Sequence, residues 1–104
     1  MFGLFNRIPS ISTGELQQKL NKDLILLDVR TPSEYRGGHI AAAKNVPLNK
    51  IANYQQRQNE PVYVICQSGM RSKQAAKILK NKGYDVVNVT GGMTRWNGPI
   101  RGGK

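Results

Sequence analysis

The sequence is poor in several features that would support other classes of protein. It has one cysteine among 104 residues, so an internal disulfide and a metal site built from several thiolates are both excluded. Apolar residues come in short blocks, as at 24–27 and 62–65, and never in the roughly 20-residue runs that cross a membrane. Residues 1–5 lack the basic start and the long apolar core of a signal peptide. We therefore expect a cytoplasmic protein with no membrane partner.

Acidic residues are also few: six, against 16 lysines and arginines, for a net charge of +10. This balance favours anionic ligands or an acidic partner surface. At about 100° per residue, the lysines at 73, 77 and 80 fall on one face of a predicted helix. Ser72, Ala75, Ala76 and Leu79 form the opposite face, so we expect a buried face opposite a solvated one. No aromatic residues alternate with these lysines to stack on bases, so the charge does not indicate nucleic-acid recognition.

Helix signals alternate with the apolar blocks. Residues 12–15 have the form of a capping box, and the helix they open carries Leu16 and Leu20 on one face. A second capping box at 31–34, with proline at the first helical position, predicts a short helix that stops near Gly37. Further helices are expected at 48–57, through 71–82, and after Gly91 and Gly92, in a segment that holds Trp96.

Strands are predicted at 24–29, 43–46, 62–65 and 86–89. Strands that alternate with helices indicate an α/β domain with a central, mostly parallel sheet flanked by helices. We expect one domain over residues 1–104, with a core at about 11–97, a short N-terminal lead and a flexible, basic, glycine-rich C-terminal tail. Ligands of such sheets sit beyond the carboxyl ends of the strands, and Cys66 falls at such an end.

Cys66 lies between a buried strand and the start of a helix. If residues 67–71 curl into a ring, their backbone N–H groups point at the sulfur, and the helix adds partial positive charge. Both effects favour a thiolate and so a nucleophile that needs no neighbouring base. Gly69 allows the tight turn, and Arg71 can add a full positive charge. An ordinary strand–helix turn with a buried thiol would show the same spacing.

Four ordered segments resemble the signatures of the rhodanese homology domain, and the resemblance runs from about residue 11 to 96. They are Leu27-Asp28-Val29-Arg30 with Glu34 and Tyr35; Gly38-His39-Ile40 with Ala43, Asn45, Val46 and Pro47; Cys66 to Arg71; and Gly91-Gly92-Met93-Thr94-Arg95-Trp96. One departure is Ala42, where the family usually has glycine. It should matter little if this residue needs no positive φ. The resemblance implies a three-layer α/β fold and a sulfurtransferase without metal or cofactor.

The resemblance also implies the roles of the loop. Cys66 would take a sulfane sulfur from thiosulfate or a persulfide donor. That sulfur would be held by the backbone N–H groups of Gln67, Ser68, Gly69, Met70 and Arg71. Gln67 and Ser68 would also set the polarity of the pocket, and Met70 would shape its rim. Cys66 through Arg71 is six residues; relatives with seven are phosphatases or arsenate reductases, whose larger ring surrounds a tetrahedral oxyanion. Because there is no second cysteine, an external thiol, cyanide or a protein must accept the sulfur.

Other residues of these motifs are expected to support the site. Asp28 and Arg30, at a strand end, would brace it. The Arg71 side chain could contact substrate or pair inward with a carboxylate, and the sequence favours neither. His39 is expected to form structural hydrogen bonds, since attack by a thiolate needs no general base. Trp96 would be part of the core or of the pocket wall.

Three other functions are alternatives to the sulfurtransferase interpretation. A persulfide carrier that relays sulfur to a partner protein would have the same loop. A phosphatase or arsenate reductase is disfavoured by the six-residue loop, and an inactive structural domain is disfavoured by the intact Cys66.

Overall fold

The computed structural model describes residues 7–104. The reading of residues 1–5 as lacking a signal peptide lies outside this range. Within residues 7–104, no helix combines the length and the apolar character needed to cross a bilayer.

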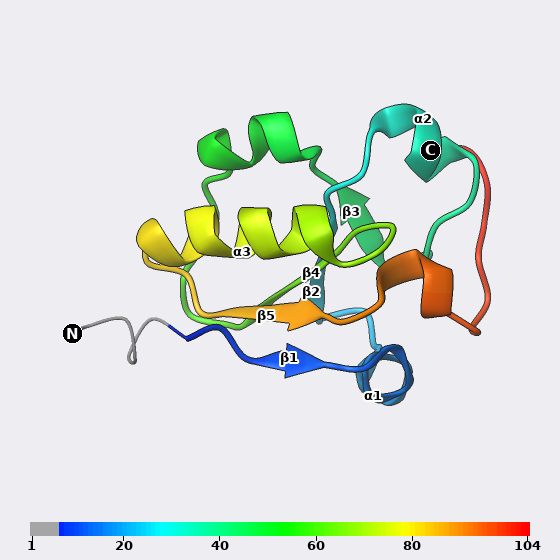
Figure 1. Cartoon of the computed structure of the whole chain (residues 1–104), viewed down its shortest axis with the longest axis horizontal. Helices are drawn as coiled ribbons and strands as arrows, with labels where there is room; N and C mark the ends of the chain where they lie inside the picture. The colour runs from blue at the N-terminus through cyan, green and yellow to red at the C-terminus, as the bar shows by residue number, and fades with distance from the viewer. Residues whose placement is uncertain (1–6) are drawn as a thin grey trace.

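A five-stranded sheet with strand order β1-β5-β4-β2-β3 forms the centre of the fold (Figure 1). The strands are β1 (Ser10–Ile11), β2 (Ile25–Asp28), β3 (Ala43–Asn45), β4 (Val62–Ile65) and β5 (Val86–Val89). The α-helices are α1 (Thr13–Lys19), α2 (Pro32–Arg36) and α3 (Met70–Asn81), and the 3-10 helices are η2 (Leu48–Asn53) and η3 (Gly92–Arg95). All neighbouring strands run parallel, so their carboxyl ends share one edge of the sheet. The predicted α/β class is confirmed.

Successive residues of the central strands point to opposite faces, and each face has its own buried cluster. Leu27 and Val64 pack under α3 and η2, whereas Leu26 and Ile65 pack with residues of α1 and with Trp96. Figure 1 shows α3 and η2 on one side of the strands and α1 on the other. The result is a three-layer arrangement that buries the sheet on both faces, as parallel sheets require.

Both predicted capping boxes are present. Ser12 Oγ accepts a hydrogen bond from Glu15 N (3.1 Å), and Glu15 Oε1 accepts one from Ser12 N (3.0 Å). Thr31 and Glu34 form the same reciprocal pair at the start of α2. These bonds satisfy backbone N–H groups that have no partner within the first helical turn.

The structure differs from the prediction at three elements. Strand β1 was not predicted, because two residues carry no periodicity; it forms by pairing Ser10 and Ile11 with the edge of β5. The helix expected at 48–57 is a 3-10 helix that ends at Asn53, where Tyr54 turns to an extended conformation. Trp96 follows η3 as its C-terminal cap instead of lying within it.

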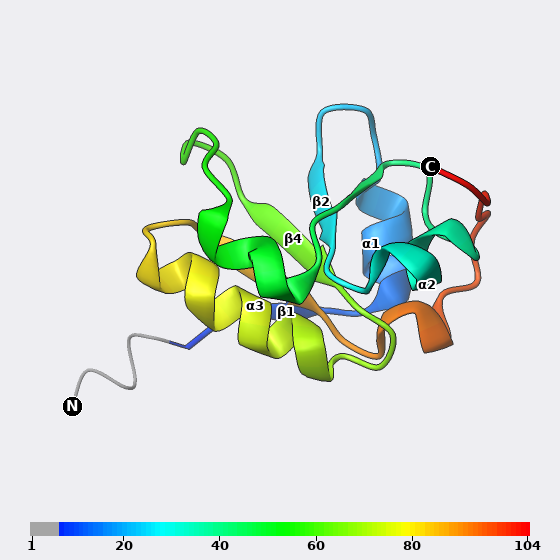
Figure 2. The same cartoon turned by 90° about the horizontal axis from the view of Figure 1, so that it is seen from above.

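Residues 101–103 of the predicted C-terminal tail pair with backbone groups of residues 36 and 39. Arg101 N donates to His39 O (2.8 Å), and His39 N donates to Arg101 O (2.9 Å). Gly103 N donates to Arg36 O (2.8 Å). In both Figure 1 and Figure 2 the C-terminal end accordingly lies beside α2. Composition carries no information on such backbone pairing between distant segments, so the sequence did not indicate these contacts.

Candidate active site

Cys66 lies at the carboxyl end of β4, a central strand, and the next turn leads into α3. Its side chain is fully buried. Gly69 precedes α3 with φ +106°, a left-handed conformation that glycine adopts without strain. This conformation turns the chain back toward the sulfur.

Gly69 N and the Ser72 hydroxyl both hydrogen-bond with the Cys66 sulfur. Gly69 N donates a hydrogen bond to Sγ (2.9 Å). The thiol in turn donates to Ser72 Oγ at 3.4 Å, and that hydroxyl donates to Gly69 O (3.1 Å). When Cys66 ionises it can no longer donate, and the Ser72 hydroxyl can rotate to donate to the thiolate instead.

The net effect of these surroundings is a lowered pKa of the Cys66 thiol. Burial raises the pKa, but hydrogen bonds from the Ser72 side chain and from the backbones of Ser72, Gly69 and Ser68 together outweigh it. Of the donors expected from the loop, Gly69 N forms a hydrogen bond with the sulfur, and the Ser68 backbone contributes to the lowered pKa. Ser72 joins them from the first turn of α3. Sequence reasoning placed Ser72 on the buried face of the helix without a role. The feature that could have indicated a role is that Ser72 is polar, whereas the other residues of this face are alanine and leucine.

Replacing Ser72 with alanine will raise the pKa of the Cys66 thiol, because the variant loses the side chain that lowers it most. The rate of alkylation by iodoacetamide, measured against pH, will rise to its plateau at higher pH than in the wild type. Ser33→Ala, at an exposed position of α2, is the matched control and will leave the profile unchanged. An unchanged profile in Ser72→Ala would show that the hydroxyl does not stabilise the thiolate.

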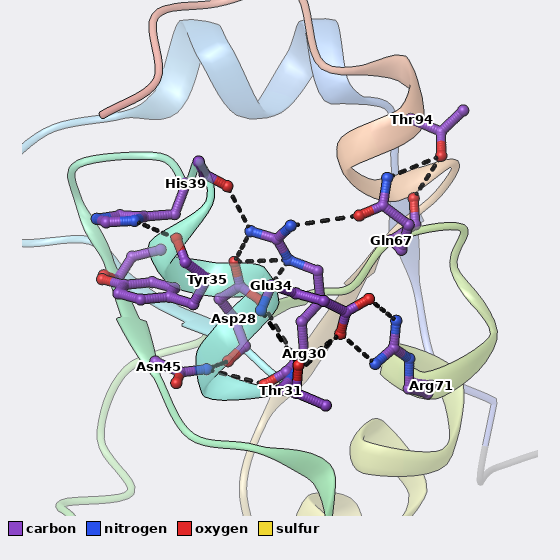
Figure 3. A network of polar contacts seen from close by, with 12 residues as sticks. Asp28, Arg30, Thr31, Glu34, Tyr35, His39, Asn45, Gln67, Arg71 and Thr94 are labelled. Atoms are coloured by element: carbon purple, nitrogen blue, oxygen red, sulfur yellow. Dashed lines mark hydrogen bonds and ion pairs between the residues drawn. The ribbon is translucent and has the colours of Figure 1, made fainter. Parts of the chain in front are cut away.

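Gln67 fixes the loop through its side chain and its backbone (Figure 3). Its Oε1 accepts a hydrogen bond from Arg30 Nη1 (3.2 Å), and its Nε2 donates to Thr94 Oγ1 (3.3 Å). Thr94 Oγ1 donates to Gln67 O (2.8 Å). The Gln67 side chain is thus committed to holding the loop between two other segments, whereas a role in pocket polarity had been expected.

Asp28, the last residue of β2, and Arg30, two residues later, are both buried. Arg30 Nη2 lies 2.8 Å from Asp28 Oδ2 and also donates to Gly38 O (2.8 Å). Asn45 Nδ2 donates to the carbonyl oxygens of Asp28 (2.9 Å) and Arg30 (3.0 Å). With its contact to Gln67, Arg30 connects the strand end, the loop after α2 and the cysteine loop (Figure 3).

The Arg71 side chain pairs with a carboxylate, which answers the question that the sequence left open. Its Nη1 and Nη2 lie 2.7 Å and 2.9 Å from the two carboxylate oxygens of Glu34. Glu34 also caps α2, so one side chain joins α2 to the start of α3. The hydrogen bond from Arg71 lowers the pKa of Glu34 to about 2, and Glu34 in turn raises the pKa of Arg71.

Replacing Glu34 with glutamine will flatten the acid dependence of stability. Because the pKa of Glu34 is depressed in the folded state, ionised Glu34 stabilises the fold. This stabilisation is complete above about pH 4.5 and is lost as the pH falls through about 2. The pair is about one-third exposed, so its contribution is about 1 kcal/mol or less. Urea unfolding across this pH range measures how the free energy of unfolding depends on pH. Glu60→Gln is the matched control at an exposed site. Equal acid dependence in Glu34→Gln and the wild type would contradict the assignment.

His39 and Trp96 have structural partners. His39 is buried and stacks on the ring of Tyr35 at 3.6 Å between centroids, and its Nδ1 lies 2.7 Å from Tyr35 O. Trp96 belongs to the buried cluster on the α1 side of the sheet, and its Nε1 donates to Pro99 O (3.1 Å). These contacts support the hydrogen-bonding role expected for His39 and the core role expected for Trp96.

The turn before η3 supports the cysteine loop from outside. Met93 N donates to Cys66 O (2.8 Å), and Thr94 N donates to Gln67 O (3.0 Å). Gly91 and Gly92 have φ of +82° and +57°. A Cβ on Gly92 would overlap Cys66 O and lie 2.7 Å from Gln67 O, so the close approach needs glycine. The backbone oxygens of Cys66 and Gln67 are therefore held from the outer side of the loop.

Comparison with known protein families matches residues 12–99 to the rhodanese-like domain. The chain belongs to this family. It is 33% identical over 95 residues to the thiosulfate sulfurtransferase GlpE of Pseudoalteromonas translucida (strain TAC 125), covering 88% of this chain and 89% of GlpE. The structure of a rhodanese-like domain protein from Staphylococcus aureus superposes with a TM-score of 0.86 at 35% identity, covering 93% of this chain and all of that one.

Some relatives of this rhodanese-like domain are longer proteins. The chain is 40% identical over 97 residues to the putative sulfur carrier protein YrkF of Bacillus subtilis (strain 168), covering 88% of this chain but 52% of YrkF. It is 42% identical over 85 residues to the uncharacterized protein YqhL of the same organism, covering 76% of this chain and 65% of YqhL. The chain thus spans between half and two-thirds of the length of these two relatives.

Two grooves flank the cysteine loop of this rhodanese-like domain. One, of about 870 Å³, includes Ser68 and Arg95 in its lining, and the other, of about 410 Å³, is partly lined by Arg71. Met70 lies at the start of α3 and is 68% exposed. Ala42 has no positive φ, so alanine fits at this departure from the family pattern. Within residues 7–104 there is no group of three or more potential metal ligands.

Proposed function

We propose that this rhodanese-like domain is a sulfurtransferase that moves a sulfane sulfur from thiosulfate or a persulfide donor to an external acceptor through a Cys66 persulfide. The observation that carries the proposal is the environment of Cys66. Its sulfur accepts a hydrogen bond from Gly69 N (2.9 Å), lies 3.4 Å from the Ser72 hydroxyl and has a lowered pKa. These features supply a thiolate without a neighbouring histidine or other base.

In the first step the Cys66 thiolate attacks the outer sulfur of thiosulfate. A bond forms between Sγ and that sulfur, the sulfur–sulfur bond of thiosulfate breaks, and sulfite leaves with the bonding electron pair. The negative charge of the thiolate moves to the terminal sulfur of the persulfide. No proton is transferred, so the step needs no general acid or base.

The loop is suited to hold the terminal sulfur. The backbone N–H groups of Ser68 and Gly69 and the Ser72 hydroxyl already act on the Cys66 thiol, and the start of α3 adds partial positive charge. Fixed donors aimed at a site where negative charge accumulates need no reorganisation during the reaction. Because Cys66 is fully buried, a compact donor such as thiosulfate fits the site better than a bulky one.

In the second step an external nucleophile attacks the terminal sulfur and returns Cys66 to the thiolate. Cyanide would leave as thiocyanate, and a thiol or protein cysteine would leave as a persulfide. The chain has one cysteine, so the acceptor must be another molecule. A catalytic thiol of this kind must stay reduced, which supports a cytoplasmic location.

Thiosulfate:cyanide turnover tests the proposal against the phosphatase alternative. We expect thiocyanate to form from thiosulfate and cyanide, with no measurable hydrolysis of an aryl phosphate, because the six-residue loop encloses a single sulfur atom. Hydrolysis of the aryl phosphate without thiocyanate formation would refute the proposal. Persulfide formation without either turnover would favour the carrier.

The likeness to the putative sulfur carrier protein YrkF supports a second candidate, a persulfide relay for a partner protein. The two candidates differ in their donor and in their rate of release. A carrier would be loaded by a cysteine desulfurase faster than by thiosulfate and would release sulfur to cyanide slowly. Comparing both loading rates in the same preparation distinguishes them.

A further inference from the structure

A separate cavity of about 300 Å³ lies between α3 and the edge of the sheet where β1 pairs with β5. Figure 1 shows α3 above β5, with β1 at the adjoining edge. Its lining includes Arg7, Ser10, Lys73, Lys77 and Asn88, and none of the residues 66–71. The cavity is therefore distinct from the site of the proposed sulfur transfer.

Asn88 forms the polar interior of this cavity. It is 2% exposed, and neither its Nδ2 nor its Oδ1 has a hydrogen-bond partner within the described part of the chain. Strand alternation places Asn88 on the same face of β5 as Val86, which belongs to the cluster under α3. Buried amides almost always have partners, so an amide with both groups unpaired beside a cavity indicates a ligand or water there.

Positive charge surrounds the opening of the cavity. Arg7, Lys73 and Lys77 are exposed, and among residues 7–104 none of them forms an ion pair. None of the six acidic residues of the chain lines the cavity. An anion entering here would meet three cations and no competing carboxylate, so its charge would be stabilised without displacing an existing pair.

We propose that this cavity, lined by Arg7, Lys73, Lys77 and Asn88, binds a compact phosphate-type anion that also carries an O–H group. Asn88 Nδ2 donates to an anionic oxygen, and Asn88 Oδ1 accepts from the O–H group. The three cations neutralise the charge. Hydrogen phosphate offers both groups at neutral pH, whereas sulfate of the same shape has no donor and leaves Oδ1 unpaired.

NMR titration of the full chain with inorganic phosphate, and separately with sulfate, tests the site directly. The side-chain amide resonances of Asn88, identified by their loss in Asn88→Val, report on the cavity independently of Cys66. We expect phosphate to shift these resonances with saturation, and sulfate to shift them with at least several-fold weaker affinity. The same result in Cys66→Ser separates this proposal from sulfur transfer.

Paired variants test the cations and the amide. Lys73→Gln/Lys77→Gln will weaken phosphate binding at Asn88 by at least about tenfold, because two charges close to the anion are lost. Lys19→Gln/Lys50→Gln changes the net charge equally at exposed sites outside the cavity and will leave the affinity within about twofold. Asn88→Val will lose binding, followed by the backbone resonances of Lys73 and Lys77, without a lower melting temperature, because the amide makes no hydrogen bond that valine would remove.

Two results would overturn the proposal. One is saturating phosphate that leaves the Asn88 side-chain resonances unmoved and shifts the cysteine loop alone. Another is equal affinity for sulfate and phosphate, which would remove the role of Asn88 Oδ1.

Discussion

Replacing Cys66 with serine will reduce thiosulfate:cyanide turnover to background, a loss of roughly a thousandfold or more. A serine hydroxyl is not ionised at neutral pH, and it cannot form the sulfur–sulfur bond on which transfer depends. The groups that lower the pKa of the thiol, from Ser72, Gly69 and Ser68, remain in the variant but have no thiolate to stabilise. Thiocyanate formation at saturating thiosulfate measures the effect.

The fold of the Cys66→Ser variant serves as its control. Serine is close in size to cysteine, and its hydroxyl can accept from Gly69 N and donate to Ser72 Oγ as the thiol does. We therefore expect its free energy of unfolding to lie within about 1.5 kcal/mol of the wild type, the range of one hydrogen bond. Turnover within tenfold of the wild type in a variant that folds normally would contradict the nucleophilic role of Cys66.

Replacing Gly92 with alanine will destabilise the fold by about 2 to 6 kcal/mol, the sum of backbone strain and overpacking. Its φ of +57° is unfavourable for a residue with a Cβ. The added methyl would also meet the backbone oxygens of Cys66 and Gln67, which belong to a strand end and a tight loop and cannot rotate away. Urea unfolding measures the loss.

The same substitution will disturb the thiol. Relief of the overlap requires η3 to move away, which breaks the bonds from Met93 N and Thr94 N to the loop and loosens the donors around Cys66. The pH profile of Cys66 alkylation should therefore shift toward that of an ordinary thiol. Gly102→Ala is the matched control, since its Cβ would lie 3.5 Å from Arg36 O, an ordinary contact. Equal stability of Gly92→Ala and Gly102→Ala would show that η3 does not hold the loop.

The elements that sequence predicted well depend on residues close together in the chain. Each capping box joins residues three apart, so Ser12 with Glu15 and Thr31 with Glu34 could be recognised from spacing. The position of Cys66 at a strand end followed from one apolar block and the helix after it. The family resemblance then supplied the order of the motifs, and the fold that it implied is confirmed.

The features that sequence missed depend on contacts between distant segments. The partner of Arg71 is Glu34, 37 positions away, and only the folded chain brings α2 close to the start of α3. The pairing of Arg101 with His39 and of β1 with β5 likewise arises between segments far apart in the chain. Ser72 was visible as a polar residue on a buried helical face, but its contact with Cys66 depends on the left-handed turn at Gly69.

The central claim is that Cys66 carries sulfur, and intact-mass measurement after thiosulfate treatment tests it most directly. The wild type should gain the mass of one sulfur atom and lose it when cyanide is added, and Cys66→Ser should gain nothing. A gain that persists in Cys66→Ser would place the sulfur elsewhere in the chain. No gain in the wild type, with either thiosulfate or a persulfide donor, would contradict the account.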